Sequence, residues 1–93
     1  MNNNQQYPKE GWLKCKEIED GIFPNEYSVI GETADNKMFS LFADKGFVNR
    51  DKNTLKVEIL ECNEGTCYIF LPSEPFEMKN TIKVNKENIE YDT

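Results

Sequence analysis

The side chains best suited to chemistry in this 93-residue sequence are its three cysteines and its 17 carboxylates, because it contains no histidine. Without histidine there is no Ser/His/Asp triad, no Cys/His pair, no His-ligated metal and no imidazole pH switch. Any catalytic or metal chemistry would therefore have to come from thiols and carboxylates alone.

The cysteines are the first candidates for such a site. Cys62 and Cys67 bracket a predicted turn, so their thiols are expected near each other across a hairpin. A zinc site needs about four ligands, usually Cys or His, and after Cys15 the remainder would have to come from carboxylates such as Glu61 or Glu64. Three cysteines are an odd number at low density, unlike a secreted disulfide framework. We therefore expect buried, free, structural thiols, no metal and no cofactor.

The carboxylates cluster around two predicted turns without forming an obvious pair. General acid–base catalysis needs two carboxyl groups in a pocket that separates their pKa values. A small domain filled by its own side chains leaves little room for such a pocket. The sequence therefore predicts a protein that is not an enzyme, with its carboxylates on solvated strand faces.

Short strands are the elements that must position these residues. Segments with period-2 alternation, or with β-branched and aromatic residues, recur between Gly, Pro, Asn and Asp, and no window of a dozen residues keeps helical spacing. The expected strands cover residues 12–18, 26–32, 38–43, 55–62, 67–71 and 81–84. Residues 33–37 are predicted to form a hairpin turn, and residues 85–88 a single helical or 3₁₀ turn.

Six short strands in about 80 residues close most economically as a small antiparallel barrel. We expect all-β architecture resembling an SH3-like barrel, with an OB-like barrel as the alternative. Residues 1–9 are polar and aperiodic and are predicted to be a disordered or loosely attached tail, and residues 10–93 a single domain.

Two strands have unusual patterns. The alternation in 55–62 slips at Ile59 and Leu60, which indicates a bulge or a strand covered on both faces. The segment 67–71 is apolar on both faces and is predicted to be central. Because small open barrels can pair edge to edge, the sequence leaves a homo-oligomer open.

An aromatic and acidic region suggests a binding surface. Residues 10–35 contain seven acidic and two basic side chains, a local charge of −5, interleaved with Trp12, Phe23 and Tyr27. Aromatic faces beside carboxylates favour cationic or proline-rich peptide partners. We therefore predict a protein-interaction module with Trp12, Glu19, Asp20, Phe23 and Tyr27 as the contact, and weigh against it a structural role for the same aromatic residues.

The net charge of −6 makes nucleic acid an unfavourable partner, since phosphate binding depends on Lys and Arg. The alternative function is a nucleic-acid-binding barrel that uses a basic strip in the C-terminal half. The longest apolar run has five residues and the N-terminus lacks a secretory pattern, so no membrane contact and a cytoplasmic location are expected. The basic strip consists of Arg50, Lys52, Lys56, Lys79, Lys83 and Lys86.

Overall fold

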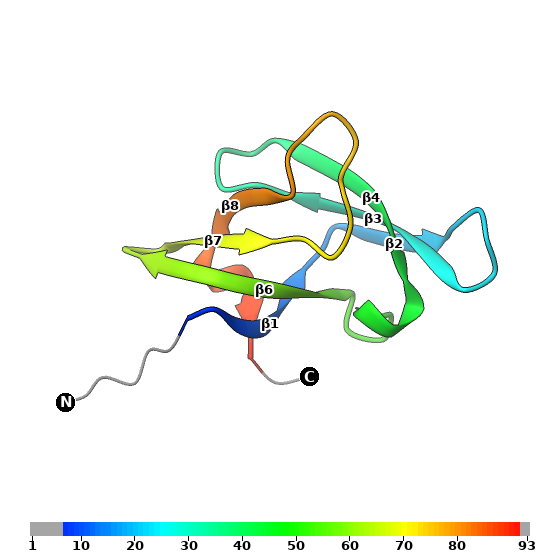
Figure 1. Cartoon of the computed structure of the whole chain (residues 1–93), viewed down its shortest axis with the longest axis horizontal. Helices are drawn as coiled ribbons and strands as arrows, with labels where there is room; N and C mark the ends of the chain where they lie inside the picture. Colours follow the sequence, from blue (N-terminus) through cyan, green and yellow to red (C-terminus); the bar gives the residue numbers. More distant parts are fainter. Residues whose placement is uncertain (1–6, 92–93) are drawn as a thin grey trace.

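The computed structural model describes residues 7–91, and their regular elements are strands and two short 3₁₀ turns (Figure 1). In chain order the elements are β1 (Lys9–Lys14), β2 (Glu17–Asp20), β3 (Glu26–Glu32), β4 (Met38–Asp44), η1 (Lys45–Phe47), β5 (Val48–Asn49), β6 (Thr54–Asn63), β7 (Thr66–Phe70), β8 (Thr81–Asn85), η2 (Lys86–Asn88) and β9 (Ile89–Glu90). All strand pairs are antiparallel. The predicted all-β class is confirmed.

The strands form two sheets. The chain passes from the first to the second at the junction between β1 and β2, and it returns from β4 through η1 to β5. One sheet has the order β8-β7-β6-β1-β9, with β5 also paired to β6, and the other has the order β2-β3-β4. At the junction the amide of Cys15 donates to the carbonyl of Asn53 (2.9 Å), whereas the amide of Lys16 donates to that of Ile30 (2.8 Å). Consecutive residues thus bond to different sheets. The single strand predicted over residues 12–18 is therefore wrong, because the chain changes sheets within it.

The β3–β4 hairpin follows the predicted local pattern. Its strands pair in register from Glu26 opposite Asp44 to Glu32 opposite Met38. The turn closes through the amide of Thr33, which donates to the Lys37 carbonyl (2.8 Å), and the Lys37 amide, which donates to the Thr33 hydroxyl (3.1 Å). The hairpin turn predicted at residues 33–37 is confirmed.

Strands β6 and β7 match the sequence prediction in part. The β6–β7 register shifts between Ile59 and Glu61, which confirms the bulge expected from the slipped alternation. Strand β7 lies between β6 and β8, as its apolar sequence predicted. However, Tyr68 and Phe70 are 42% and 44% exposed. Only the face with Cys67 and Ile69 lies against the core, so the aromatic side chains of the other face remain partly in water.

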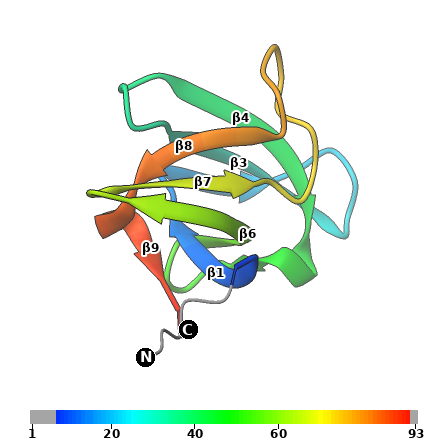
Figure 2. The same cartoon turned by 60° about the vertical axis from the view of Figure 1, so that its left-hand side comes forward.

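On the other side of the domain, the β3–β4 turn reaches β8 and the β7–β8 loop reaches β4, without a strand ladder between the two sheets (Figure 2). The amide of Ala34 donates to the Lys83 carbonyl (2.8 Å), and the amide of Phe76 donates to the Ser40 carbonyl (2.9 Å). The two sheets thereby enclose one core, to which both contribute side chains. Its buried members are Leu13, Ile18, Val29, Phe39, Leu41, Ala43, Leu55, Val57, Ile59, Cys67, Ile69, Leu71, Ile82, Val84 and Ile89.

The shortest elements and the N-terminal segment were predicted only in part. The 3₁₀ turn predicted within residues 85–88 is confirmed as η2. The two-residue strands β5 and β9 were not predicted, because two residues are too few to show alternation. Of the predicted tail at residues 1–9, residues 1–6 lie outside the described part, while Tyr7 packs against the core and Lys9 begins β1.

The β6–β7 turn contains a residue whose backbone conformation is unfavourable. Glu64 and Gly65 both have positive φ angles, 45° and 95°. Glycine adopts positive φ angles without strain, but glutamate does not. Two-residue turns of this kind prefer Asn followed by Gly. We expect Glu64→Asn to raise the free energy of unfolding by about 0.5–1 kcal/mol, measured by urea denaturation. The same substitution at Glu61, whose φ is not positive, should bring no gain; equal effects at both positions would refute the conformational explanation.

Candidate functional site

The loop between β2 and β3 brings together three of the five residues predicted to bind a partner. Asp20 lies opposite Tyr27 in the β2–β3 register, and Phe23 lies in the loop that joins them. The loop is held by the amide of Gly21, which donates to the Glu26 carbonyl (3.1 Å), and by the amide of Glu26, which donates to the Phe23 carbonyl (3.2 Å). In Figure 1 this loop projects from the end of its sheet.

The outermost part of this loop is apolar, and we call Ile22, Phe23 and Pro24 the tip. Ile22 is 72% exposed and Phe23 is 64% exposed. They are adjacent in sequence, and a carboxylate lies on each side of them, Asp20 before and Glu26 after. A single exposed apolar side chain is common on protein surfaces, but two large neighbouring ones form a patch of the kind that marks an interaction site. Phe23 was among the predicted contact residues, whereas Ile22 was not, because no separate pattern in the sequence marks it.

Distant cations offset the local acidic charge. Arg50 Nη1 lies 3.2 Å from Asp20 Oδ1. Lys45 Nζ and Arg50 Cζ lie 4.9 Å and 5.1 Å from the centroid of the Tyr27 ring. The aromatic face that was expected to attract a partner's cation is thus already near two cations of the same chain. These contacts could not be predicted from the local charge count, because both cations lie outside the acidic window and Arg50 had been assigned to the basic strip.

The two other predicted residues do not belong to the tip. Glu19 is exposed and lies opposite Ser28, one residue before Asp20, so strand alternation directs it to the other face of its sheet. Trp12 is half-buried in β1, in the other sheet, with Lys56 and Glu90 as its register partners. The five predicted residues therefore do not form one continuous surface.

A second surface feature lies on the outer face of the sheet that contains Trp12. Glu10, Glu58 and Phe70 are successive register partners on β1, β6 and β7, so their side chains form one row across three strands. The row lines a shallow pocket of about 240 Å³ together with Phe47 and Pro72, and we call this pocket the outer-face groove. Its volume is below the range of about 300–1,000 Å³ usual for small-molecule sites.

The six residues of the predicted basic strip are dispersed. Arg50 pairs with Asp20, and Lys56 Nζ lies 3.5 Å from Glu10 Oε1. On β8, Lys83 lies 5.6 Å from the centroid of the Tyr68 ring. Several of these cations are thus engaged with groups of their own chain. The strip occupies the loop before β6, β6 itself, the β7–β8 loop, β8 and η2.

The prediction of three free thiols is wrong. Cys62 and Cys67 are register partners in the β6–β7 hairpin and form a disulfide. Their pairing also removes the zinc alternative, because a disulfide offers no thiolate ligand. Proximity was predicted correctly, but the sequence pattern favoured reduced thiols. Since disulfides persist mainly in oxidising compartments, the cytoplasmic location stays a prediction.

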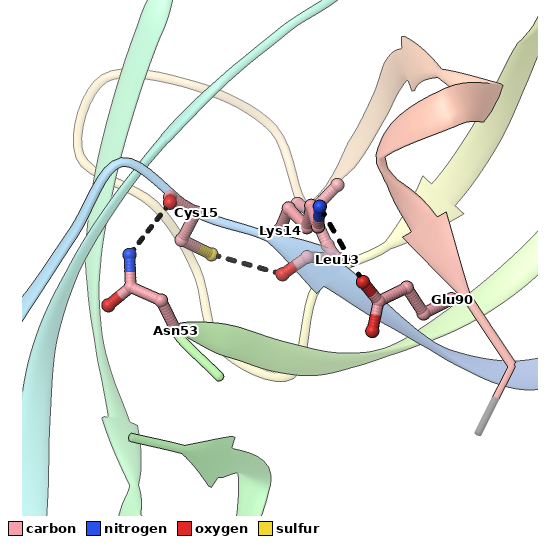
Figure 3. Close-up of polar contacts among 5 residues, drawn as sticks. All are labelled: Leu13, Lys14, Cys15, Asn53 and Glu90. Atoms are coloured by element: carbon pink, nitrogen blue, oxygen red, sulfur yellow. Dashed lines mark hydrogen bonds and ion pairs between the residues drawn. The ribbon is translucent and has the colours of Figure 1, made fainter. Parts of the chain in front are cut away.

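Cys15 is free and lies at the junction of the two sheets (Figure 3). Its Sγ donates to the Leu13 carbonyl (3.4 Å), and Asn53 Nδ2 donates to the Cys15 carbonyl (2.8 Å). Burial raises the pKa of Cys15 from 9.0 to about 12, with a smaller opposing effect from a backbone hydrogen bond at Leu55. Because the thiolate is the nucleophile, this environment makes Cys15 unreactive at neutral pH.

We expect native Cys15 to react far more slowly with iodoacetamide at pH 8 than the same thiol in urea-unfolded protein. The raised pKa of Cys15 also makes the stability of the protein depend on pH. The folded protein keeps a proton that the unfolded chain loses above pH 9, so this contribution is present below pH 9 and declines as the pH rises toward about 12. A Cys15→Ala variant should lack this part of the alkaline decline. Rapid native labelling would contradict the burial argument.

Within residues 7–91 no three Cys, Asp or Glu side chains gather to hold a metal ion. Over the same residues, no helix has the length and apolar character needed to cross a bilayer.

The fold and surface define a small all-β domain of two antiparallel sheets, with an apolar loop tip and a shallow aromatic groove. Comparisons with protein-family models, with curated proteins and with solved structures gave no significant match. The functional conclusions below therefore depend on the residues and contacts of this chain.

Proposed function

We propose that this domain is a non-catalytic protein-interaction module that binds its partner through the tip. The observation that supports the proposal is the exposure of Ile22 and Phe23, 72% and 64%, side by side on a hydrogen-bonded loop. A loop with fixed ends loses little conformational freedom when it binds. Large apolar side chains in such a position are suited to act as anchors in a partner's pocket.

The charges near the tip define the kind of partner. Asp20 and Glu26 border the tip, and Glu26 accepts a hydrogen bond from the Phe23 amide. Lys45 also lines the hollow beside the tip, so the local field is mixed. We propose a partner with an apolar pocket or segment that carries basic residues at its edge. The proposed partner is basic, as the sequence predicted. Its main contact, however, is an apolar one with Phe23 and not a cation–π contact with Tyr27.

The proposed architecture of this module is a small SH3-like barrel. It is supported by the continuous path from β1 into β2, by the hydrogen bond from the β3–β4 turn to β8, and by the one from the β7–β8 loop to β4. The non-catalytic assignment is supported by the absence of histidine from the sequence and by the exposure of Glu19, Asp20 and Glu58.

The test is selection of a random peptide library on the wild-type protein, followed by fluorescence anisotropy with the enriched peptides. We expect Ile22→Ser/Phe23→Ser to weaken binding at least about 10-fold, because anchor residues typically contribute more than 1 kcal/mol each. Met38→Ser is the matched control, since Met38 is 55% exposed at the opposite end of the β3–β4 ladder.

Three outcomes would reject the proposal: no enriched peptide, equal binding to the double variant, or an equal loss with Met38→Ser. Short RNA and DNA are titrated in parallel at low salt. Salt-dependent binding to them that survives the double variant would instead support the basic-strip alternative.

A further inference from the structure

We propose that the outer-face groove is a second binding site, which receives an arginine side chain from an extended partner peptide. The groove lies on the sheet opposite the one that carries the tip, and its residues take no part in the proposed function above. The two sites can therefore be tested independently.

Two carboxylates of the groove form an unbalanced pair. Glu10 and Glu58 lie directly opposite each other on β1 and β6, an arrangement that is unfavourable for like charges. Lys56 reaches Glu10 Oε1 at 3.5 Å, but among the described residues Glu58 has no ion-pair partner. A cation placed between the two carboxylates would relieve their repulsion.

Two aromatic rings form a wall beside these charges. Phe70 is the register partner of Glu58 and is 44% exposed, and Phe47, 39% exposed, lines the same groove. A cation near an aromatic ring gains from the negative face of the ring. Apolar rings beside carboxylates also suit a side chain with a hydrocarbon stem and a charged end.

The geometry favours arginine over lysine. Directly opposed side chains on neighbouring strands have Cβ atoms about 4.5–5.5 Å apart, so one planar guanidinium can donate to carboxylates on both strands. A guanidinium also stacks on aromatic rings, whereas an ammonium is a compact and strongly hydrated charge. The volume of about 240 Å³ suits one side chain better than a larger ligand.

Lys56 is the internal competitor for this site. Its ammonium group occupies the Glu10 side of the groove, where an incoming guanidinium would have to share or replace it. Removal of the Lys56 charge should therefore strengthen binding, while removal of the Glu58 charge should weaken it. Opposite effects from two groove residues distinguish a specific site from a merely destabilised fold.

The probe is a fluorescein-labelled peptide of alternating glycine and arginine, with lysine and citrulline versions as controls. Citrulline keeps the shape of arginine without its charge. We expect Glu58→Gln to weaken binding of the arginine peptide about 5-fold and Lys56→Gln to strengthen it about 3-fold. Matched controls outside the groove are Glu87→Gln and Lys86→Gln in η2, which make the same changes in net charge. Thermal unfolding confirms that each variant is folded.

Amide chemical shifts then locate the contact. The arginine peptide should shift the signals of Glu58 and Phe70, and Ile22→Ser/Phe23→Ser should leave its affinity unchanged. Equal losses from Glu58→Gln and Glu87→Gln would reduce the effect to net charge and overturn the proposal. Equal binding of the lysine or citrulline peptide, shifts confined to the tip, or absence of binding would also overturn it.

Discussion

Phe39→Ala is expected to lower the free energy of unfolding by about 3–5 kcal/mol, because it deletes a fully buried aromatic ring. A domain of this length is stable by about 5–14 kcal/mol, so the change removes a large part of the total. Phe39 is the largest of the fully buried side chains and is 2% exposed. Urea denaturation followed by circular dichroism measures the difference. Phe23→Ala provides the control, since that ring is 64% exposed and its loss should cost less than about 0.5 kcal/mol.

The ring of Phe39 also restricts which residue can lie opposite it on β3. Gly31 is the register partner of Phe39, and a Cβ atom built on Gly31 would overlap Phe39 Cζ and lie 2.6 Å from Cε2. The ring thus occupies the space that any other residue at position 31 would fill. Gly31→Ala should therefore destabilise the protein by about 1–3 kcal/mol through overpacking.

A double-mutant cycle tests this contact. If the ring is the obstacle, Gly31→Ala should cost much less in the Phe39→Ala background than in the wild type, because the clashing atoms are gone. Equal costs in both backgrounds would show that the backbone freedom of Gly31, and not its contact with Phe39, explains its presence.

Local patterns predicted most of the strands because their evidence is contained in adjacent residues. The β3–β4 hairpin joins two alternating segments across a short polar turn, and the bulge at Ile59 showed as a break in alternation. The division of the first strand could not be predicted in this way. Nothing in Cys15 and Lys16 indicates that their amides bond to different sheets, since that depends on where Asn53 and Ile30 come to lie.

The candidate sites were harder to predict because they depend on distant residues. Asp20 and Arg50 are 30 positions apart, so a local charge count could not include their pairing. The outer-face groove needs the registers of three strands to bring Glu10, Glu58 and Phe70 into one row. An apolar run such as β7 also does not reveal which of its faces is covered.

Reduction of the Cys62–Cys67 disulfide is expected to lower the free energy of unfolding by about 2 kcal/mol. The bridge joins residues five positions apart, and in the chain-entropy account so small a loop restricts the unfolded chain only modestly. For a domain of this size the loss corresponds to a fall in Tm of about 8–16 °C. Thermal unfolding with and without a phosphine reductant measures it.

Cysteine variants and a thiol count show whether the loss of stability comes from the Cys62–Cys67 disulfide. Cys62→Ala/Cys67→Ala should unfold near the temperature of the reduced wild type and should not respond to reductant, whereas Cys15→Ala should keep the full response. Denatured, unreduced protein should show one reactive thiol, and three after reduction. Three thiols before reduction would contradict the disulfide and restore the interpretation of free cysteines.

The effect of reduction should be confined to stability. Cys62 and Cys67 are already opposite each other in the β6–β7 ladder, and the same ladder places Glu58 opposite Phe70. Backbone hydrogen bonds, which reduction leaves intact, hold this register. Below its unfolding transition, the reduced protein should therefore keep the chemical shifts of Glu58 and Phe70 and its affinity for the arginine peptide. A loss of binding at a temperature where the reduced protein is still folded would mean that the disulfide also holds the outer-face groove in shape.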